Sequence, residues 1–277
     1  MLINTGMSHA NSVNRSCLSV VIPVYNEEAS LAEVVRKLLL LPQLLEVVIV
    51  DDCSTDRSAE VAQSLSQGNP RVQLIRQQRN MGKTAALRSG FAVTRGEIVI
   101  VQDADLEYDP EEIPLVIGPI LEGRADVVFG SRFLVRRAVR VLYFYHYLAN
   151  KFLTFTSNLL TNLNMTDIET CYKAFRGDII RNMVITSRGF GFEVECTAKV
   201  AKLRCAIYEV PISYYGRTYE EGKKIGLKDG MIAFWLILRF NLFCRVSSAF
   251  RKLPERSASW RPQERNAAPA KADGMSA

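Results

Sequence analysis

Short apolar segments alternate with helical segments along the first half of the chain, and this alternation restricts the fold more than any other feature. The apolar segments are "LSVVIPVYNE", "LEVVIVDD", "VQLIRQQ", "GEIVIVQDAD" and "ADVVFGSRF". Between them, apolar residues recur with the spacing of helices. A strand that is apolar throughout is buried on both faces, as in a parallel sheet covered by helices. The sequence therefore predicts an α/β fold with a mostly parallel sheet flanked by helices.

Polar clusters stand at the ends of four of these predicted strands. They read "PVYNE", "DDCSTD", "DADLE" and "GSRF". In open α/β sheets, ligands bind beyond the carboxyl ends of the strands, where the ends of parallel strands meet. We therefore expect these four clusters to converge on one ligand site.

The segment "VQDADLEYDP" places three acids, Asp103, Asp105 and Glu107, directly after a buried strand. Their charges repel one another unless a cation lies between them. A buried strand cannot continue through acids whose charges repel one another, so we expect the strand to end or bend here. A short acid pair, completed by waters and phosphates, suits Mg²⁺ or Mn²⁺. The alternative is a solvated acidic turn.

Charge and composition narrow the function classes. The net charge is +6 and the pI is about 9.0, which suits anionic partners such as nucleotides or phospholipid headgroups. Binding to nucleic acid is not expected, because the basic residues lie in separated segments without a matching motif.

The segment around Lys83, "NMGKTAALRSG", imitates a P-loop, but Gln77 stands where that motif requires glycine. A P-loop is therefore not predicted.

After residue 132 the strand–helix alternation gives way to other patterns. "VLYFYHYLANKFLTFTSNLLT" predicts a long aromatic helix, either core or in contact with lipid, and "AIYEVPISYY" predicts a strand. "MIAFWLILRFNLFCRVSSAFRKL" predicts basic amphipathic helices on a membrane surface, docked on the domain itself, or in an oligomer interface. No stretch of 18 apolar residues indicates a transmembrane helix. The predicted units are a disordered N-terminus (1–16), a catalytic domain (17–215), a charged loop with amphipathic helices (216–253) and a disordered tail (254–277).

In combination, the four polar clusters and "QDADLEYDPEEI" resemble the family 2 glycosyltransferases of GT-A fold. "DIETCYKAFR", "GFEVE" and "EVPISYYGRTYEEGKKIGLKDG" are similar to the branch with dolichyl-phosphate mannosyltransferase and bacterial polyprenyl-phosphate glycosyltransferases. The resemblance spans about Leu18 to Arg239. The transmembrane hairpins that follow the catalytic domain in many members have no counterpart in this sequence.

The resemblance implies roles for particular residues. The nucleotide donor would be bound by Pro23, Tyr25, Glu27, Asp51, Asp52, Lys83 and Ala104, with Arg217 and Lys223 near the phosphates. The metal would be held by Asp103, Asp105 and, as an additional ligand, Glu107, which stands where many relatives have Gln. Catalytic roles would fall to Asp105, Arg132, Glu193 and Glu195. One of Asp51 and Asp52 would cap a helix while the other binds the nucleotide. One of Glu193 and Glu195 would orient sugar hydroxyls or act as a base while the other caps a helix.

The implied reaction is inverting transfer of a hexose from a UDP- or GDP-linked sugar to polyprenyl or dolichyl phosphate. The site would lie at the cytoplasmic face of the membrane, with the protein bound peripherally and able to form a homo-oligomer. Arg132, Arg136, Arg137 and Arg140 are either a socket for the lipid phosphate or a surface patch. Two alternatives remain: a hydroxyl acceptor on a glycolipid, glycan or protein, and a regulator that binds nucleotide sugars without catalysis.

Overall fold

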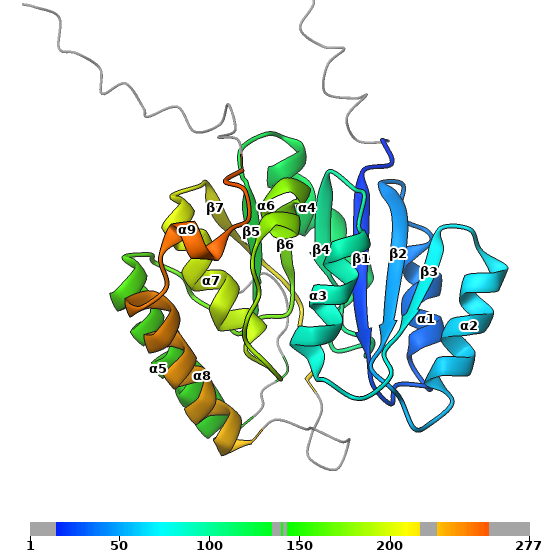
Figure 1. The fold of residues 1–277 in the computed structure, drawn as a ribbon, viewed down its shortest axis with the longest axis horizontal. Helices are drawn as coiled ribbons and strands as arrows, with labels where there is room; N and C mark the ends of the chain where they lie inside the picture. Colours follow the sequence, from blue (N-terminus) through cyan, green and yellow to red (C-terminus); the bar gives the residue numbers. More distant parts are fainter. Residues whose placement is uncertain (1–14, 135–139, 141–142, 217–225, 255–277) are drawn as a thin grey trace, which may run out of the picture.

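The computed structural model describes residues 15–134, 140, 143–216 and 226–254. They form a seven-stranded sheet in the order β3-β2-β1-β4-β6-β5-β7. Every strand pair is parallel except those of β6, which runs antiparallel to β4 and β5. The mostly parallel α/β sheet predicted from the sequence is confirmed (Figure 1). The strands are β1 (Leu18–Val24), β2 (Leu44–Asp51), β3 (Val72–Arg76), β4 (Ile98–Val101), β5 (Val127–Ser131), β6 (Lys173–Arg176) and β7 (Ile207–Pro211).

The central strands are buried on both faces, as their continuous apolar character predicts. Every residue of β4 and β5 is buried, and β1 is buried except at Pro23. Burial of so many β-branched side chains is the main favourable term in the stability of such a sheet. The five strands predicted in the first half of the chain are all present, and so is the later strand β7. Strand β6 was not predicted from the sequence.

Helices cover both faces of the sheet (Figure 1). In this view α3 lies in front of the sheet, and it packs against β1 and β2, while α1 lies behind. The helices are α1 (Leu31–Leu38), α2 (Ser58–Gly68), α3 (Lys83–Val93), the 3-10 turn η1 (Pro110–Glu112), α4 (Ile113–Leu121), α5 (Phe144–Thr161), α6 (Gly177–Asn182), α7 (Phe192–Leu203), α8 (Leu227–Leu242) and α9 (Val246–Ala249).

The helices α5 and α8 lie side by side at one end of the molecule (Figure 1), and α8 also packs against α7. One face of α8, with Leu236, Ile237 and Phe240, belongs to the same hydrophobic core as the sheet. Its opposite face leaves Ile232 and Trp235 more than half exposed. The helix is therefore docked on its own domain through one face and open to solvent on the other. None of the helices that the structure describes is long and apolar enough to cross a membrane.

Several sequence-based expectations lie outside the described residues. These are the disorder of 1–14 and 255–277 and the roles of Arg136, Arg137, Arg217 and Lys223.

Candidate functional site

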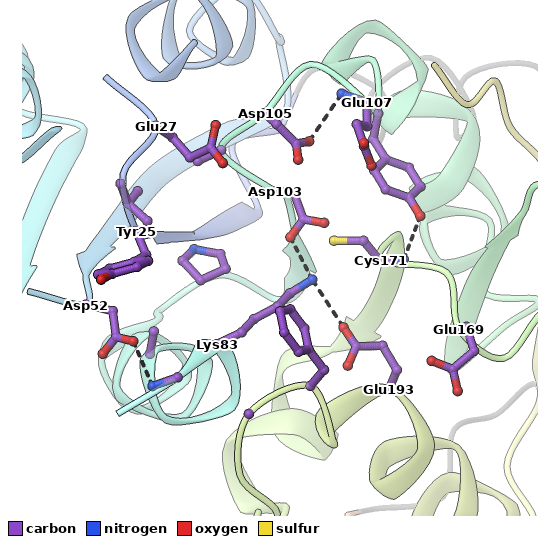
Figure 2. Close-up of a pocket in the computed structure, with 18 of the residues that line it drawn as sticks. Tyr25, Glu27, Asp52, Lys83, Asp103, Asp105, Glu107, Glu169, Cys171 and Glu193 are labelled. Carbon is purple, nitrogen blue, oxygen red and sulfur yellow. Dashed lines mark hydrogen bonds and ion pairs between the residues drawn. The ribbon is translucent and has the colours of Figure 1, made fainter. Parts of the chain in front are cut away.

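A pocket of about 420 Å³ opens at the carboxyl edge of the parallel strands (Figure 2). This size lies within the range of small-molecule sites. The four polar clusters converge here, because residues following β1, β2, β4 and β5 all contribute side chains. Of the residues predicted from the sequence, the lining contains Pro23, Tyr25, Glu27, Asp52, Lys83, Asp103, Ala104, Asp105, Glu107, Arg132 and Glu193. Asp51 and Glu195 are described but do not line the pocket.

The acidic segment that contains Asp103, Asp105 and Glu107 lies in a loop after β4, as expected from the repulsion between its charges. Strand β4 ends at Val101, and Gln102 then donates to the carbonyl groups of Asp103 and Tyr108, which holds the following loop against the sheet. The carboxylate of Asp105 accepts a hydrogen bond from the backbone N–H of Glu107 at 3.2 Å. Asp103 and Asp105 both line the pocket as a result.

The donor set of this loop fits a divalent ion that also binds phosphate. Within the described ranges no group of three histidine, cysteine or acidic side chains is arranged to hold a metal by itself. Two carboxylates, those of Asp103 and Asp105, leave coordination positions for phosphate oxygens and water, which is the usual arrangement for Mg²⁺ bound with a nucleotide. Glu107 lines the same pocket, but its carboxylate also accepts a hydrogen bond from the Tyr214 hydroxyl at 3.0 Å.

Lys83 connects the acidic loop to the opposite wall of the pocket. It is the first residue of α3, and its Nζ donates to Asp103 at 2.8 Å and lies 3.2 Å from Glu193 (Figure 2). Burial by itself lowers the pKa of Lys83, but the charges of Asp103 and Glu193 outweigh burial and raise this pKa well above its usual value. Lys83 therefore keeps its positive charge inside the pocket.

Asp52 shapes the turn that leads into α3. Its carboxylate accepts hydrogen bonds from the backbone N–H groups of Met81 at 2.9 Å and Gly82 at 2.7 Å. Gly82 has φ of +87°, and a Cβ atom there would lie 3.1 Å from the backbone of Gly189. The turn therefore requires glycine at this position.

The structure places Asp51 away from the pocket lining and does not support its predicted contact with the nucleotide. It is fully buried as the last residue of β2, and its carboxylate accepts from the backbone N–H of Ser54 at 3.2 Å. The helix-cap alternative is also wrong for both aspartates, because α2 begins at Ser58 after Arg57 and has no side-chain cap.

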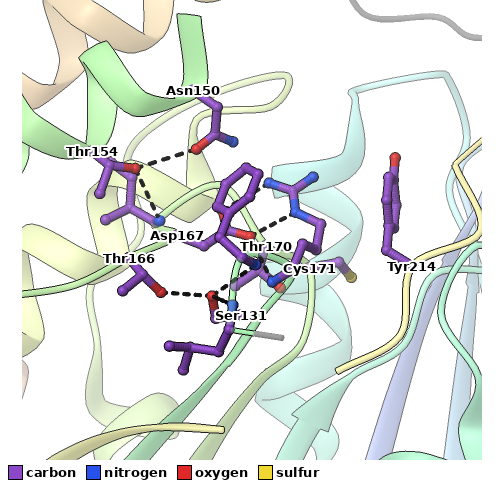
Figure 3. Close-up of polar contacts among 12 residues, drawn as sticks. Ser131, Asn150, Thr154, Thr166, Asp167, Thr170, Cys171 and Tyr214 are labelled. Atoms are coloured by element: carbon purple, nitrogen blue, oxygen red, sulfur yellow. Dashed lines mark hydrogen bonds and ion pairs between the residues drawn. The ribbon is translucent and has the colours of Figure 1, made fainter. Parts of the chain in front are cut away.

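Arg132 is held in the pocket wall by an acid that sequence reasoning missed. Its guanidinium donates through Nε at 2.7 Å and Nη2 at 2.8 Å to the two carboxylate oxygens of Asp167, which is fully buried (Figure 3). It also lies 5.1 Å from the ring centroid of Tyr214. Burial opposes both charges, yet their pairing raises the pKa of Arg132 and lowers that of Asp167. Arg140, by contrast, donates to the carbonyl oxygen of Gly216 at 2.9 Å.

Glu193 and Glu195 lie on different sides of the first turn of α7, because residues two positions apart do not share a helix face. Glu193 lines the pocket. Glu195 is fully buried and accepts from the backbone N–H groups of Thr186 at 2.9 Å and Ser187 at 2.7 Å, and its partner Lys199 lies 2.5 Å away. The structure therefore places Glu195 away from the pocket, in contact with the turn before α7, and does not support its predicted catalytic role.

We expect Glu195→Ala to lower the free energy of unfolding by about 3–5 kcal/mol, because Lys199 would remain as an unpaired buried charge. Burial by itself raises the pKa of Glu195, but the hydrogen bonds from Lys199 and Ser187 outweigh burial, so the pKa is lower than its usual value. This electrostatic contribution is therefore fully present above the unfolded value of 4.5 and is lost as the pH falls from there through the lower pKa of the folded protein.

Thermal unfolding at pH 7 and pH 4 measures this difference. Glu60→Ala is the control, since Glu60 pairs with Arg57 on the surface with 75% of its side chain exposed. The control should change stability by less than about 1 kcal/mol. Equal stability of Glu195→Ala and the wild type at pH 7 would contradict the structural role.

The sequence analysis missed other lining residues, among them Tyr108, Glu169, Cys171 and Tyr214. Glu169 and Cys171 precede β6, which begins at the edge where the parallel strands end because it runs the opposite way. The only signal in the sequence was their place in "DIETCYKAFR", within the resemblance.

Comparison with models of known families matches residues 19–184 to "Glycosyl transferase family 2". The chain belongs to glycosyltransferase family 2. The recognition made from the sequence motifs is therefore confirmed.

Relatives of this family 2 protein are named as undecaprenyl-phosphate transferases. One is the undecaprenyl-phosphate 4-deoxy-4-formamido-L-arabinose transferase of Pseudomonas aeruginosa, 35% identical over 226 residues, which cover 79% of this chain and 64% of the relative. The chain thus spans less than two thirds of that relative's length. Another is the undecaprenyl-phosphate mannosyltransferase of Micrococcus luteus, 32% identical over 216 residues, covering 74% of this chain and 86% of the relative.

The fold is shared with a solved family of glycosyltransferase structures. Glucosyl-3-phosphoglycerate synthase from Mycobacterium tuberculosis, crystallised with Mn²⁺, UDP and glucosyl-3-phosphoglycerate, superposes with a TM-score of 0.62 and 20% identity. The match covers 87% of this chain and 86% of that one. At this identity the likeness shows the fold alone, and it confirms the GT-A class predicted for this family 2 chain.

Proposed function

We propose that this chain transfers a hexose, with inversion, from a UDP- or GDP-linked sugar to a polyprenyl phosphate. The observation that carries the proposal is the convergence of Asp103, Asp105, Lys83 and Arg132 on one pocket at the carboxyl edge of the sheet. This arrangement combines two carboxylates that suit a metal ion with two fixed positive charges. The names of the two relatives, both undecaprenyl-phosphate transferases, support the same acceptor class.

The donor would lie along the pocket with its nucleoside near Tyr25 and Asp52 and its diphosphate near Asp103 and Asp105. A bound Mg²⁺ or Mn²⁺ would supply charge neutralisation for the departing nucleoside diphosphate. Lys83 contributes a second positive charge at the same place, because its Nζ is held 2.8 Å from Asp103. The mycobacterial synthase, which shares the fold, was crystallised with Mn²⁺ and UDP, and this supports a divalent ion and a nucleotide as ligands of the pocket.

The side chains that line the pocket distinguish a phosphate acceptor from a hydroxyl acceptor. A hydroxyl acceptor needs a positioned base, whereas a phosphate monoester is already largely dianionic at neutral pH and needs positive charge to hold it. Arg132 faces the pocket with its charge fixed by Asp167. The described lining contains no histidine. A phosphate acceptor is therefore favoured, and Glu193 as a base for a hydroxyl is the competing assignment.

Transfer assays with labelled UDP- and GDP-sugars and undecaprenyl phosphate test the proposal. We expect a labelled lipid whose formation requires the phosphate and is only slowed by Glu193→Gln. Efficient transfer to a neutral alcohol, abolished by Glu193→Gln, would establish the hydroxyl-acceptor alternative. Binding of the nucleotide sugar with neither transfer nor hydrolysis would establish the regulator.

We further propose that the outer faces of α5 and α8 rest on the cytoplasmic face of the membrane. These faces expose large apolar side chains, with Tyr145 at 82%, Trp235 at 60% and Phe243, just after α8, at 75%. Apolar surface of this extent, beside Arg239 and Arg245, is typical of helices that lie in the headgroup region. A homo-oligomer that covers the same surface is the competing prediction.

Point variants of the full chain test membrane contact better than truncation, because removing α8 would also remove Leu236, Ile237 and Phe240 and expose the part of the core that they cover. Phe155 on α5 is 66% exposed. We expect Phe155→Glu combined with Trp235→Glu to reduce flotation with anionic liposomes at least tenfold, since two charges would enter the apolar boundary. Leu40→Glu is the control, because Leu40 is 71% exposed at the end of α1, away from α5 and α8.

Unchanged flotation of the double variant would contradict membrane contact through α5 and α8. A shift from dimer to monomer in the same variant, measured by light scattering without lipid, would favour the oligomer.

A further inference from the structure

Two carboxylates, Glu169 and Glu193, line the end of the pocket that lies away from the proposed nucleoside position. Figure 2 shows them on one side of Lys83 and Asp103, with Tyr25 and Asp52 on the other. They come from separate elements, Glu169 from the segment before β6 and Glu193 from the first turn of α7. If the diphosphate lies at Asp103 and Asp105, the sugar of the donor extends toward this end.

Each of these carboxylates has a buried oxygen without a donor. Glu193 is 5% exposed, and its Oε1 is paired with Lys83, but its Oε2 has no hydrogen-bond partner among the residues that the structure describes. The same holds for Oε1 of Glu169. An unsatisfied buried acceptor costs about 1–3 kcal/mol. Two of them in one pocket wall indicate a place for hydrogen-bond donors from a ligand.

The two cations that act electrostatically on Glu169 have other hydrogen-bond partners. Burial is the main cause that raises the pKa of Glu169 to about 7, and the charges of Glu193 and Asp167 add to it. The positive charges of Lys173 and Arg132 oppose this increase. Lys173 directs its Nζ to the carbonyl oxygens of Ile168 and Thr170. Arg132 is bound by Asp167, as described above.

Lys173 also fixes the position of Glu169. The two carbonyl groups that its Nζ contacts belong to the residues on either side of Glu169, and Lys173 itself is fully buried. The backbone on both sides of Glu169 is therefore held in place by hydrogen bonds from the buried Lys173 side chain. A side chain on a segment held in this way is suited to recognise a ligand precisely.

We propose that Glu169, together with Oε2 of Glu193, accepts hydrogen bonds from the sugar of the donor and selects that sugar. The ligand class is a pyranose that directs hydroxyl, amide or ammonium groups toward the two carboxylates. Two carboxylates repel a phosphate dianion, so the acceptor phosphate would lie nearer Arg132. The inference rests on the proposed function, because it takes the pocket as a nucleotide-sugar site.

The test compares nucleotides with and without the sugar. Calorimetry with Mn²⁺ present would measure binding of UDP, GDP, UDP-glucose, UDP-N-acetylglucosamine, UDP-glucosamine and GDP-mannose to the full chain. We expect Glu169→Gln to weaken the preferred sugar conjugate about 10- to 100-fold, as for loss of a buried hydrogen-bond acceptor, and to leave the free nucleotide within about twofold. Preference for UDP-glucosamine would identify an ammonium group as the partner.

Glu111→Gln serves as the matched control, because Glu111 lies just beyond the same acidic loop with 72% of its side chain exposed. If Glu169→Gln weakens the free nucleotide and its conjugate equally, the residue is structural and the inference is wrong. The inference is also wrong if Glu169→Gln changes neither the affinity for the free nucleotide nor that for the sugar conjugate. Normal transfer by Glu169→Gln in that case would leave the proposed function intact. Failure of the wild type to bind any nucleotide would remove the proposed function itself.

Discussion

Asp105→Ala is expected to reduce transfer by at least about 10²- to 10³-fold while the protein remains folded. The magnitude is that typical of removing one group that stabilises developing charge in a transition state. Asp105 lies on a loop beyond the end of β4 and is only partly buried, so its loss leaves the core of the sheet intact. Formation of labelled lipid, together with a thermal unfolding curve, measures both parts of the expectation.

The same expectation includes dependence on a divalent ion. Excess EDTA should abolish transfer by the wild type, and added Mg²⁺ or Mn²⁺ should restore it. Glu111→Gln, which removes an exposed acid near the loop, should retain full activity. Full transfer in EDTA, or by Asp105→Ala, would show that the acidic loop does not hold a metal required for the reaction.

Arg132→Lys is expected to raise the KM for polyprenyl phosphate at least tenfold and to change the KM for the donor much less. Lysine keeps the charge but cannot reproduce the two-point contact with Asp167, so the charge would be displaced from its place in the pocket wall. Steady-state kinetics with each substrate varied in turn separates the two effects. Changes at Arg136, Arg137 or Arg140 are predicted to act in the same direction.

Arg132 is replaced by lysine and not by alanine, so that a change in KM is not caused by unfolding of the protein. Arg132→Ala would leave Asp167 as an unpaired buried charge, which typically costs about 3–5 kcal/mol. Arg124→Ala is the control, since Arg124 is a surface arginine with 54% of its side chain exposed. An unchanged KM for the lipid phosphate in Arg132→Lys would place the acceptor elsewhere and favour the hydroxyl-acceptor alternative.

The sequence by itself determined the class of fold and the edge at which ligands bind. Continuous apolar runs identify strands buried on both faces, and the carboxyl ends of parallel strands meet at one edge, so "DDCSTD", "DADLE" and "GSRF" could be placed together without coordinates. The end of β4 before Asp103 followed equally from charge repulsion. These inferences succeed because they depend on local pattern and on a general property of parallel sheets.

Only the tertiary structure decided which acidic side chains line the pocket and which form buried ion pairs. Glu193 and Glu195 are indistinguishable by type and spacing, but the packing of α7 directs one to the pocket and the other to Lys199. Arg132 meets Asp167 across 35 positions of sequence, a pairing with no local signal. The antiparallel direction of β6 brings Glu169 to the edge where the parallel strands end. Residue periodicity reports whether a side chain is buried, but its partner depends on how distant segments pair, and that is settled only when the chain has folded.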